Sequence, residues 1–90
     1  MISNIVYLNE RIFNGMEKKI DFKLRKGEDF IPLIQLLKIV DIASSGGEAQ
    51  AMVLAENVRL NGEIELRKRA KIRIGDVVTA FDCEVTVSAE

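Results

Sequence analysis

The sequence feature that most constrains the fold is the pair Asn61-Gly62, which lies between two segments of alternating polarity. Asn-Gly is the strongest short-range signal for a β-hairpin, because a type I′ turn needs positive φ at both central residues. Before the pair, Val58 and Leu60 are predicted to face inward, on either side of Arg59. The return strand is predicted to have an apolar and a charged side, with Ile64 and Leu66 facing in and Glu63, Glu65 and Arg67 facing out.

The residues that follow predict further strands and turns. If the alternation of the preceding strand continues, three of these side chains face inward: Ala70, Ile72 and Ile74. The same parity would bury the ammonium group of Lys68, so we predict that the strand ends or bulges there and that the chain turns. Gly75-Asp76 predicts another turn, and residues 77–81 and 84–87 predict a final hairpin.

Positive charge is concentrated in one short segment of an otherwise balanced chain. Residues 67–73 contain five basic side chains and no acidic one, whereas the whole chain has 13 basic and 14 acidic residues and a net charge of −1. A local basic face on a small domain of nearly neutral charge indicates a polyanionic partner, most often nucleic acid. The alternative is a solvated strand whose basic side chains protect a sheet edge against aggregation. Charge alone favours neither interpretation.

Two elements are predicted at the start of the domain. Residues 18–24 alternate as a half-buried strand, with Ile20, Phe22 and Leu24 on the inner face, and residues 25–28 predict a turn. Asp29 is a predicted helix cap, with Pro32 in the first helical turn. The helix is predicted to run to about Ile42, because four residues follow the spacing of an amphipathic helix: Leu33, Leu36, Leu37 and Val40.

A second helix is predicted directly after the joint at residues 43–47. Ser45 and Glu48 have the spacing of a capping box, which marks a helix start. The apolar residues of this helix are predicted to be Ala49, Met52 and Val53, followed by Ala55 or Glu56. Asn57 is its predicted end, since asparagine tolerates the left-handed conformation. The open N–H groups at the helix start offer a place for a phosphate, although most capped helix starts bind only water.

Composition excludes several classes of protein. Ninety residues make one domain, with too little chain for a core plus a roomy catalytic cleft. The single cysteine, Cys83, favours a reducing compartment, and the absence of histidine argues against a zinc site. No apolar run has the length of a membrane span, and the start of the chain is a poor signal peptide. We therefore expect a cytoplasmic protein with no cofactor, no metal, no catalytic activity and no membrane partner.

The first 15 residues differ in pattern from the rest. Their apolar residues keep neither a helical nor a strand period, and Asn14-Gly15 ends the segment with turn chemistry. We interpret residues 1–15 as a loosely packed extension and residues 16–90 as the domain. The alternative is a short amphipathic helix that docks on the domain or on a partner.

The order of these elements resembles the RNA-binding domain named after small-subunit ribosomal protein S-four, also called the αL motif. More narrowly, the chain is similar to the small stand-alone bacterial branch typified by YbcJ. The resemblance covers roughly residues 18–82 and is carried by Leu36-Leu37-Lys38, Ser45-Gly46-Gly47-Glu48-Ala49, Val58-Arg59-Leu60-Asn61-Gly62, Arg67-Lys68-Arg69 and Gly75-Asp76-Val77-Val78. It implies an α+β fold with an N-terminal strand, two short helices and a small antiparallel sheet of hairpins. It also implies that the helix pair and the following hairpin form one surface that grips structured RNA.

The resemblance and the charge pattern together give the predicted RNA-binding residues. Many family members carry arginine or lysine at the start of the second helix, and the stand-alone branch commonly has lysine at the position of Gln50. Because this chain lacks those charges, the main contribution is assigned to the later basic block. The full set of predicted RNA-binding residues is Lys38, Ser45, Gly46, Gly47, Arg59, Arg67, Lys68, Arg69, Lys71 and Arg73.

Two functional classes follow from these observations. The favoured one is a monomeric, non-enzymatic module that binds ribosomal or transfer RNA, in ribosome assembly or translation. The other is a protein-interaction module whose basic face meets an acidic partner. The aromatic residues lie away from the basic block in sequence, so base stacking is not expected as the main mode of binding. Asp76 and Asp82 are assigned to turns, where aspartate makes local hydrogen bonds.

Overall fold

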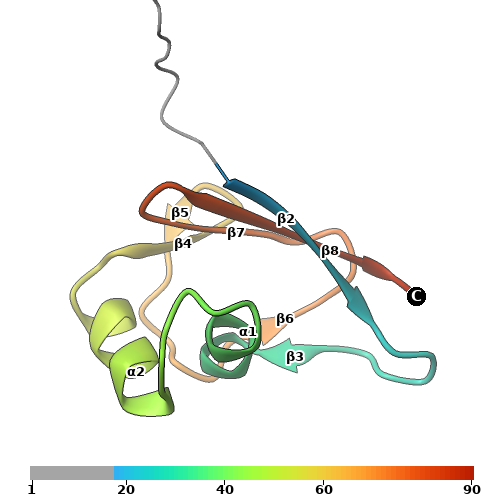
Figure 1. Cartoon of the computed structure of the whole chain (residues 1–90), viewed down its shortest axis with the longest axis horizontal. Coiled ribbons are helices and arrows are strands. Elements are labelled where there is room, and N and C mark those ends of the chain that lie inside the picture. Colours follow the sequence, from blue (N-terminus) through green and yellow to red (C-terminus); the bar gives the residue numbers. More distant parts are fainter. Residues whose placement is uncertain (1–17) are drawn as a thin grey trace, which may run out of the picture.

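The computed structural model describes residues 18–90, in which two helices cover one face of a five-stranded sheet (Figure 1). The predicted extension at residues 1–15 lies outside the described residues. The order across the sheet is β2-β8-β7-β4-β5. These strands comprise Lys18–Leu24, Cys83–Ala89, Val77–Ala80, Val58–Leu60 and Glu63–Ile64, respectively.

The first and last strands of the described chain, β2 and β8, are neighbours and run parallel. Lys18 pairs with Cys83 and Leu24 pairs with Ala89 over seven residues on each strand. The alternation predicted for β2 is confirmed, because Leu24 is buried and Ile20 and Phe22 pack against the core. The α+β fold class is confirmed too, with a mixed sheet because this one pairing is parallel.

A second, two-residue pairing joins the basic segment to the first helix. Strand β3 (Ile31–Pro32) runs antiparallel to β6 (Lys71–Ile72). Helix α1 (Leu33–Ile39) follows β3 directly, and its first two N–H groups donate to the carbonyl oxygens of Ala70 (2.9 Å) and Lys68 (3.1 Å). The basic segment is therefore held in place by the start of α1.

These contacts overturn three predictions for the first helix. Pro32 is not in the first helical turn but is the extended residue that flanks the helix. Asp29 is not the cap, because carbonyls of the basic segment satisfy the open N–H groups. The helix ends at Ile39 and not near Ile42. The reason is a left-handed residue, Asp41 (φ 66°), after which the N–H of Ile42 bonds back to Leu37.

Helix α2 comprises Gly46–Leu54, and its start is as predicted. The Ser45 hydroxyl accepts a hydrogen bond of 3.1 Å from the N–H of Glu48. The Glu48 carboxylate in turn accepts from the backbone N–H and the hydroxyl of Ser44, one residue earlier than a standard capping box. The predicted end at Asn57 is wrong by one residue, because Glu56 takes the left-handed conformation (φ 65°).

The hairpin at Asn61-Gly62 is confirmed, with φ of 52° and 90° at its two central residues. The inward and outward assignment of its return strand is wrong at Ile64 and Glu65, whereas Glu63 and Arg67 are exposed as predicted. A two-residue turn pairs Leu60 with Glu63 and Arg59 with Ile64, so Ile64 lies on the exposed face with Arg59. Glu65 then falls beside the buried Val58, to whose carbonyl oxygen its N–H donates, and its residue is only 9% exposed.

Beyond Ile64 the chain leaves the sheet, and the predicted parity holds only in part. Leu66 and Ile74 are exposed, contrary to prediction, whereas Ala70 and Ile72 are buried as predicted. The turn predicted near Lys68 is present, closed by a hydrogen bond from the N–H of Ala70 to the carbonyl oxygen of Arg67. The turn at Gly75 and the final hairpin of β7 and β8 are also confirmed.

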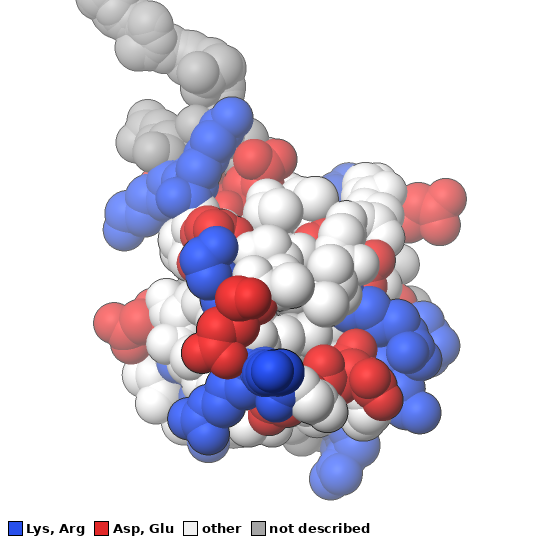
Figure 2. Space-filling view, turned by 90° about the vertical axis from the view of Figure 1, so that its right-hand side faces the viewer, with Lys and Arg blue, Asp and Glu red and all other residues white. Residues whose placement is uncertain are grey.

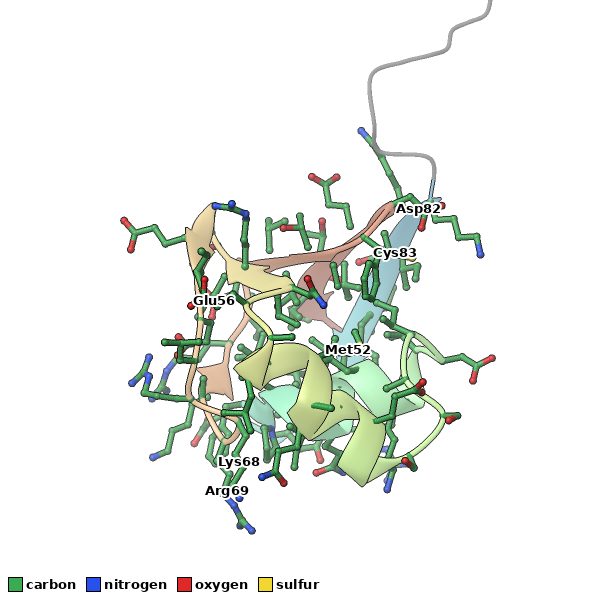
Figure 3. All side chains as sticks on the ribbon, turned by 90° about the vertical axis from the view of Figure 1, so that its left-hand side faces the viewer. Met52, Glu56, Lys68, Arg69, Asp82 and Cys83 are labelled. Carbon is green, nitrogen blue, oxygen red and sulfur yellow. The ribbon has the colours of Figure 1, made fainter. Side chains whose placement is uncertain are left out.

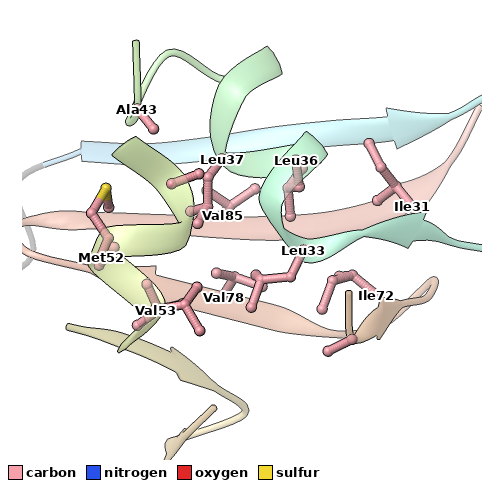
Figure 4. Packing of buried hydrophobic residues seen from close by; sticks show 14 of the residues in the cluster. Ile31, Leu33, Leu36, Leu37, Ala43, Met52, Val53, Ile72, Val78 and Val85 are labelled. Atoms are coloured by element: carbon pink, nitrogen blue, oxygen red, sulfur yellow. The ribbon is translucent and has the colours of Figure 1, made fainter. Parts of the chain in front are cut away.

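The core lies between the two helices and the sheet (Figure 4). It is built from fully buried aliphatic residues of every layer, including Leu33, Leu36, Leu37, Val53, Ile72, Val78 and Val85. Burial of each such side chain contributes about 1.5–3 kcal/mol. Because α1 and β6 both contribute to this core, the basic segment, which includes β6, is fixed relative to both helices.

Candidate nucleic-acid interface

The basic segment forms a hollow on the surface. Four of the five basic residues of this segment line it together with Ala70, and its volume is about 480 Å³; the four are Arg67, Arg69, Lys71 and Arg73. We call this the basic hollow. Figure 3 shows Lys68 and Arg69 pointing away from the body of the molecule, at the end opposite Asp82 and Cys83. The turn at Lys68 thus carries its side chains into solvent.

A second surface depression connects the basic segment to both helices. Lys38 of α1, Gly46 at the start of α2 and Arg69 line a groove of about 440 Å³, together with Ile34 and other residues of α1. We call it the helix groove. The structure therefore brings together three predicted site residues that are far apart in sequence. Arg69 lines both the helix groove and the basic hollow, so the two depressions adjoin at this residue.

Ion pairing divides the charged residues into two groups. Within residues 18–90, lysine and arginine form only three salt bridges: Lys19 with Glu84, Lys23 with Asp21, and Arg67 with Glu65. The remaining cations near the two depressions have no carboxylate of the described chain within 4.0 Å; they are Lys38, Lys68, Arg69, Lys71 and Arg73. We call these five the basic surface. On the face in Figure 2, basic side chains lie at the right-hand and lower edges and at the upper left, whereas both signs mix over its centre.

Arg67 differs from its neighbours because a carboxylate holds it. Its Nε and Nη2 donate to the two carboxylate oxygens of Glu65 at 2.9 and 3.0 Å, and its backbone N–H donates at 2.8 Å. The side-chain hydrogen bonds from Arg67 lower the pKa of Glu65, and the same contacts raise the pKa of Arg67. The charge count over residues 67–73 missed this partner because Glu65 precedes the block by two residues, although both side chains were predicted on the same outward side of the strand.

An aromatic ring accompanies the basic residues, contrary to the inference from sequence. The Lys71 ammonium nitrogen lies over the Phe30 ring, 5.0 Å from its centroid, which is within the range of a cation–π interaction. Phe30 directly precedes β3, and β3 pairs with the strand that contains Lys71. This pairing spans some 40 residues of sequence, so inspection of the basic block alone could not find it.

The other predicted site residues lie apart or have local partners. Arg59 is on the sheet face that the helices leave uncovered, opposite Thr79, and its Nη1 donates to the carbonyl oxygen of Gly62 (3.3 Å). The Ser45 hydroxyl caps α2, with Gly47 exposed in the first turn of that helix. The Glu48 carboxylate also lies at this helix start, where its negative charge opposes an incoming phosphate.

The acidic residues of the later turns have structural roles. The Asp76 carboxylate accepts from the backbone N–H of Arg73 (2.8 Å) and from the Asn61 side-chain amide (3.0 Å), which ties two turns together. Burial is the main cause that raises the pKa of the Cys83 thiol, and its hydrogen bond to Asp82 is the second.

Within the described chain, no three metal-ligating side chains come together. Neither helix of residues 18–90 has the length and apolar character of a membrane span.

Comparisons with known proteins agree with this geometry. The solution structure of YbcJ from E. coli, described as revealing an αL motif involved in RNA binding, is similar with a TM-score of 0.63 and 29% sequence identity. The similarity covers 89% of this chain and 100% of that one. No curated protein sequence matches the chain significantly. The model of the S4 domain matches residues 22–88, most of the sequence, and the chain therefore belongs to the S4 domain family.

Proposed function

We propose that this protein is a non-catalytic module that binds structured RNA through the basic surface. Membership of the S4 domain family and the similarity to YbcJ support RNA as the polyanion. The observation that carries the proposal is the cluster of five cations without carboxylate partners in residues 18–90, in a chain of net charge −1. Nucleic acid is the common partner for such a local basic surface.

In the proposed mode of binding, the protein recognises the phosphates and the shape of the folded RNA. The base edges of an RNA duplex lie in a deep, narrow groove, so proteins bind duplexes mainly through phosphates and 2′-hydroxyls. Arg69 can present two parallel N–H groups to one phosphate, whereas Lys38, Lys68 and Lys71 act as point charges. Lys38 and Arg69 share the helix groove, so one RNA strand lying along it meets both. Arg67 contributes less, because Glu65 already occupies its guanidinium group.

The start of α2 is a secondary part of the proposed interface. Gly46 lines the helix groove beside Lys38, so its backbone approaches a bound strand without a side chain in between. The contribution of Ser45 and Gly47 is smaller, because the Glu48 carboxylate lies in the same helical turn. Arg59 lies on another face and is assigned only to a peripheral contact with a large RNA.

The physiological RNA is proposed to be ribosomal or transfer RNA, in the cytoplasm, with the protein acting as a monomer. The test is a salt titration of binding to a transfer RNA and to a ribosomal RNA hairpin. Neutralised phosphates release condensed counterions, so log affinity should fall against log salt with a slope of about −3 to −5 for three to five contacts. Binding that does not depend on salt would contradict the proposed mode.

Absence of binding would have a different meaning. If the protein binds neither RNA above background at low salt, the basic surface has another partner, and the protein-interaction alternative with an acidic protein is favoured. In that case, removal of cations from the basic surface should weaken capture by an acidic protein ligand. Equal binding to unrelated folded RNAs would support recognition of phosphates and shape over recognition of sequence.

A further inference from the structure

A third depression borders α1 and the loop before β3. It is about 480 Å³ in volume and lies between the end of β2, the loop before β3 and the exposed side of α1. Its apolar lining consists of Phe22, Phe30, Ile31, Pro32 and Ile39. Phe30 and Ile39 leave 37% and 53% of their surface exposed, although both are large and apolar. We call this the Phe30 groove.

The Phe30 groove is continuous with the proposed RNA interface. It shares Pro32, Gln35 and Ile39 with the helix groove, where Lys38 and Arg69 lie. Phe30, which lines the Phe30 groove, also contacts the ammonium group of Lys71, and Lys71 lines the basic hollow. A strand held by the basic surface therefore passes beside an exposed aromatic ring.

The polar lining indicates which part of a nucleotide enters. Arg25 and Glu28 both line the groove, so their opposite charges offset each other, and one oxygen of the Glu28 carboxylate accepts from the backbone N–H of Arg25. The Lys23 ammonium pairs with Asp21 (3.0 Å), so its charge is largely offset. Gln35 offers an amide donor and a carbonyl acceptor, the pattern that suits a base edge. An aromatic flank with such groups fits a neutral, planar, hydrogen-bonding ring.

We propose that the Phe30 groove holds one unpaired nucleobase of the RNA whose phosphates lie on the basic surface. The base stacks on Phe30, its edge faces Gln35, and Lys71 bonds a neighbouring phosphate. Bases within a duplex are stacked on one another and unavailable, so the preferred RNA is a helix interrupted by a bulge or junction. This inference rests on the proposed function and narrows its substrate class to RNA with an extruded base.

The test compares a fully paired short RNA duplex with the same duplex carrying one bulged adenosine. The wild-type protein should bind the bulged duplex about tenfold more tightly, as expected for one stacked base. Phe30→Leu keeps an apolar side chain but removes the ring, so it should abolish this preference and leave affinity for the paired duplex within about twofold. Phe81→Leu is the matched control, since Phe81 is exposed at the β7–β8 turn, outside the three depressions.

A second variant and a second readout keep the test decisive if Phe30→Leu fails to fold. Gln35→Ala changes an exposed helical residue and should reduce the preference for the bulged duplex about threefold, roughly the value of one hydrogen bond. With 2-aminopurine at the bulge, wild type should change its fluorescence on binding, and the Phe30 variant should change it less. Equal affinity of wild type for both duplexes would overturn this inference and leave the proposed function intact. Binding to neither duplex would overturn both.

Discussion

The uncovered face of the sheet and the basic surface use the same kinds of side chain in opposite ways. On the sheet face, Lys19 faces Glu84 across the β2–β8 pairing at 3.9 Å, and Lys23 lies 3.0 Å from Asp21. Ser88 joins this network by donating to Asp21 at 2.9 Å, and hydrogen bonds from Lys23 and Ser88 lower the Asp21 pKa. On the basic surface, none of the five cations has such a partner within the described chain.

Pairing, and not the number of charges, distinguishes the basic surface from the uncovered sheet face, and this difference supports the binding role proposed for the basic surface. Exposed ion pairs contribute about 0–1 kcal/mol each to stability, so the sheet face gains little from its network. Its lysines Lys19 and Lys23 are nevertheless already paired, so a phosphate would have to compete with a carboxylate for them. The cations of the basic surface would exchange only water and counterions for phosphate in the proposed complex. The two regions should therefore respond differently to the same loss of charge.

The largest expected effect comes from the double variant Lys68→Ala, Arg69→Ala. Both side chains point into solvent, and a hydrogen bond to a charged group is worth about 1.5–3 kcal/mol, so RNA affinity should fall about 100-fold. The slope of log affinity against log salt should become shallower by roughly two units. The measurement is a salt titration with a transfer RNA.

The matched control for this pair is Lys18→Ala, Lys19→Ala, which removes the same charge from the start of β2. Its affinity should change less than about threefold, because only long-range attraction is lost. Melting temperatures of both variants should stay near that of wild type, since all four side chains are exposed. Equal loss of affinity in the two variants would mean that net charge, and not the basic surface, determines binding.

The next effect concerns stability and separates the hairpin turn from the interface. Gly62→Val places a β-branched residue at φ 90°, so it should cost about 1–3 kcal/mol of unfolding free energy. Gly46→Ala is the contrasting glycine change, because Gly46 has no positive φ and its added Cβ would meet no atom within 4 Å. Denaturant unfolding of the two variants measures the difference. An unchanged stability for Gly62→Val would contradict the type I′ geometry.

A smaller effect is expected from Glu65→Gln, which releases Arg67 from its carboxylate. The variant adds one available cation at the edge of the basic hollow, so RNA affinity should rise about threefold at low salt. Glu63→Gln, an exposed neighbour without an ion pair in residues 18–90, serves as the control for net charge. A fall in affinity for Glu65→Gln would show that the ion pair instead positions Arg67 for binding.

The same variant has an expected pH signature. The folded-state pKa of Glu65 lies below its ordinary value of 4.5, so the ionised carboxylate stabilises the fold above that value. This contribution is lost as the pH falls through the lowered folded-state pKa. Glu65→Gln should therefore lose less stability than wild type between neutral pH and about pH 3, as measured by denaturant unfolding.

Local chemistry in the sequence predicted the elements and turns but not the contacts between distant segments. The Asn61-Gly62 turn and the Ser45 cap follow from properties of those residues and their neighbours, and both are confirmed. The parity after the turn was predicted wrongly, although a two-residue loop already requires Glu65 and Val58 to lie on the same side. The position of Phe30 under Lys71 depends on the β3–β6 pairing, which two residues on each side are too few to signal.

The candidate site also had a part that local sequence predicted and a part that depended on contacts between distant segments. The basic block was evident from composition along the chain, because no acid interrupts residues 67–73. Which of its members keep an available charge was not evident, since that depends on where Glu65 lies after folding. The meeting of Lys38, Gly46 and Arg69 in one groove depends on the packing of α1, α2 and the turn at Lys68. Such convergence is a property of the core and carries no local sequence pattern.

The smallest expected effect is a gain from Gln50→Lys, which extends the basic surface along α2. Gln50 lies four residues after Gly46, so both share one face of the helix, and Gly46 lines the helix groove with Lys38 and Arg69. A lysine there should raise RNA affinity about threefold and steepen the salt slope by less than one unit. Ala51→Lys adds the same charge to an exposed position about 100° around the helix. A gain for Gln50→Lys alone would extend the interface to α2, because net charge would change equally in both variants. Equal gains would reduce the effect to long-range attraction, and the boundary of the basic surface would then lie at Lys38.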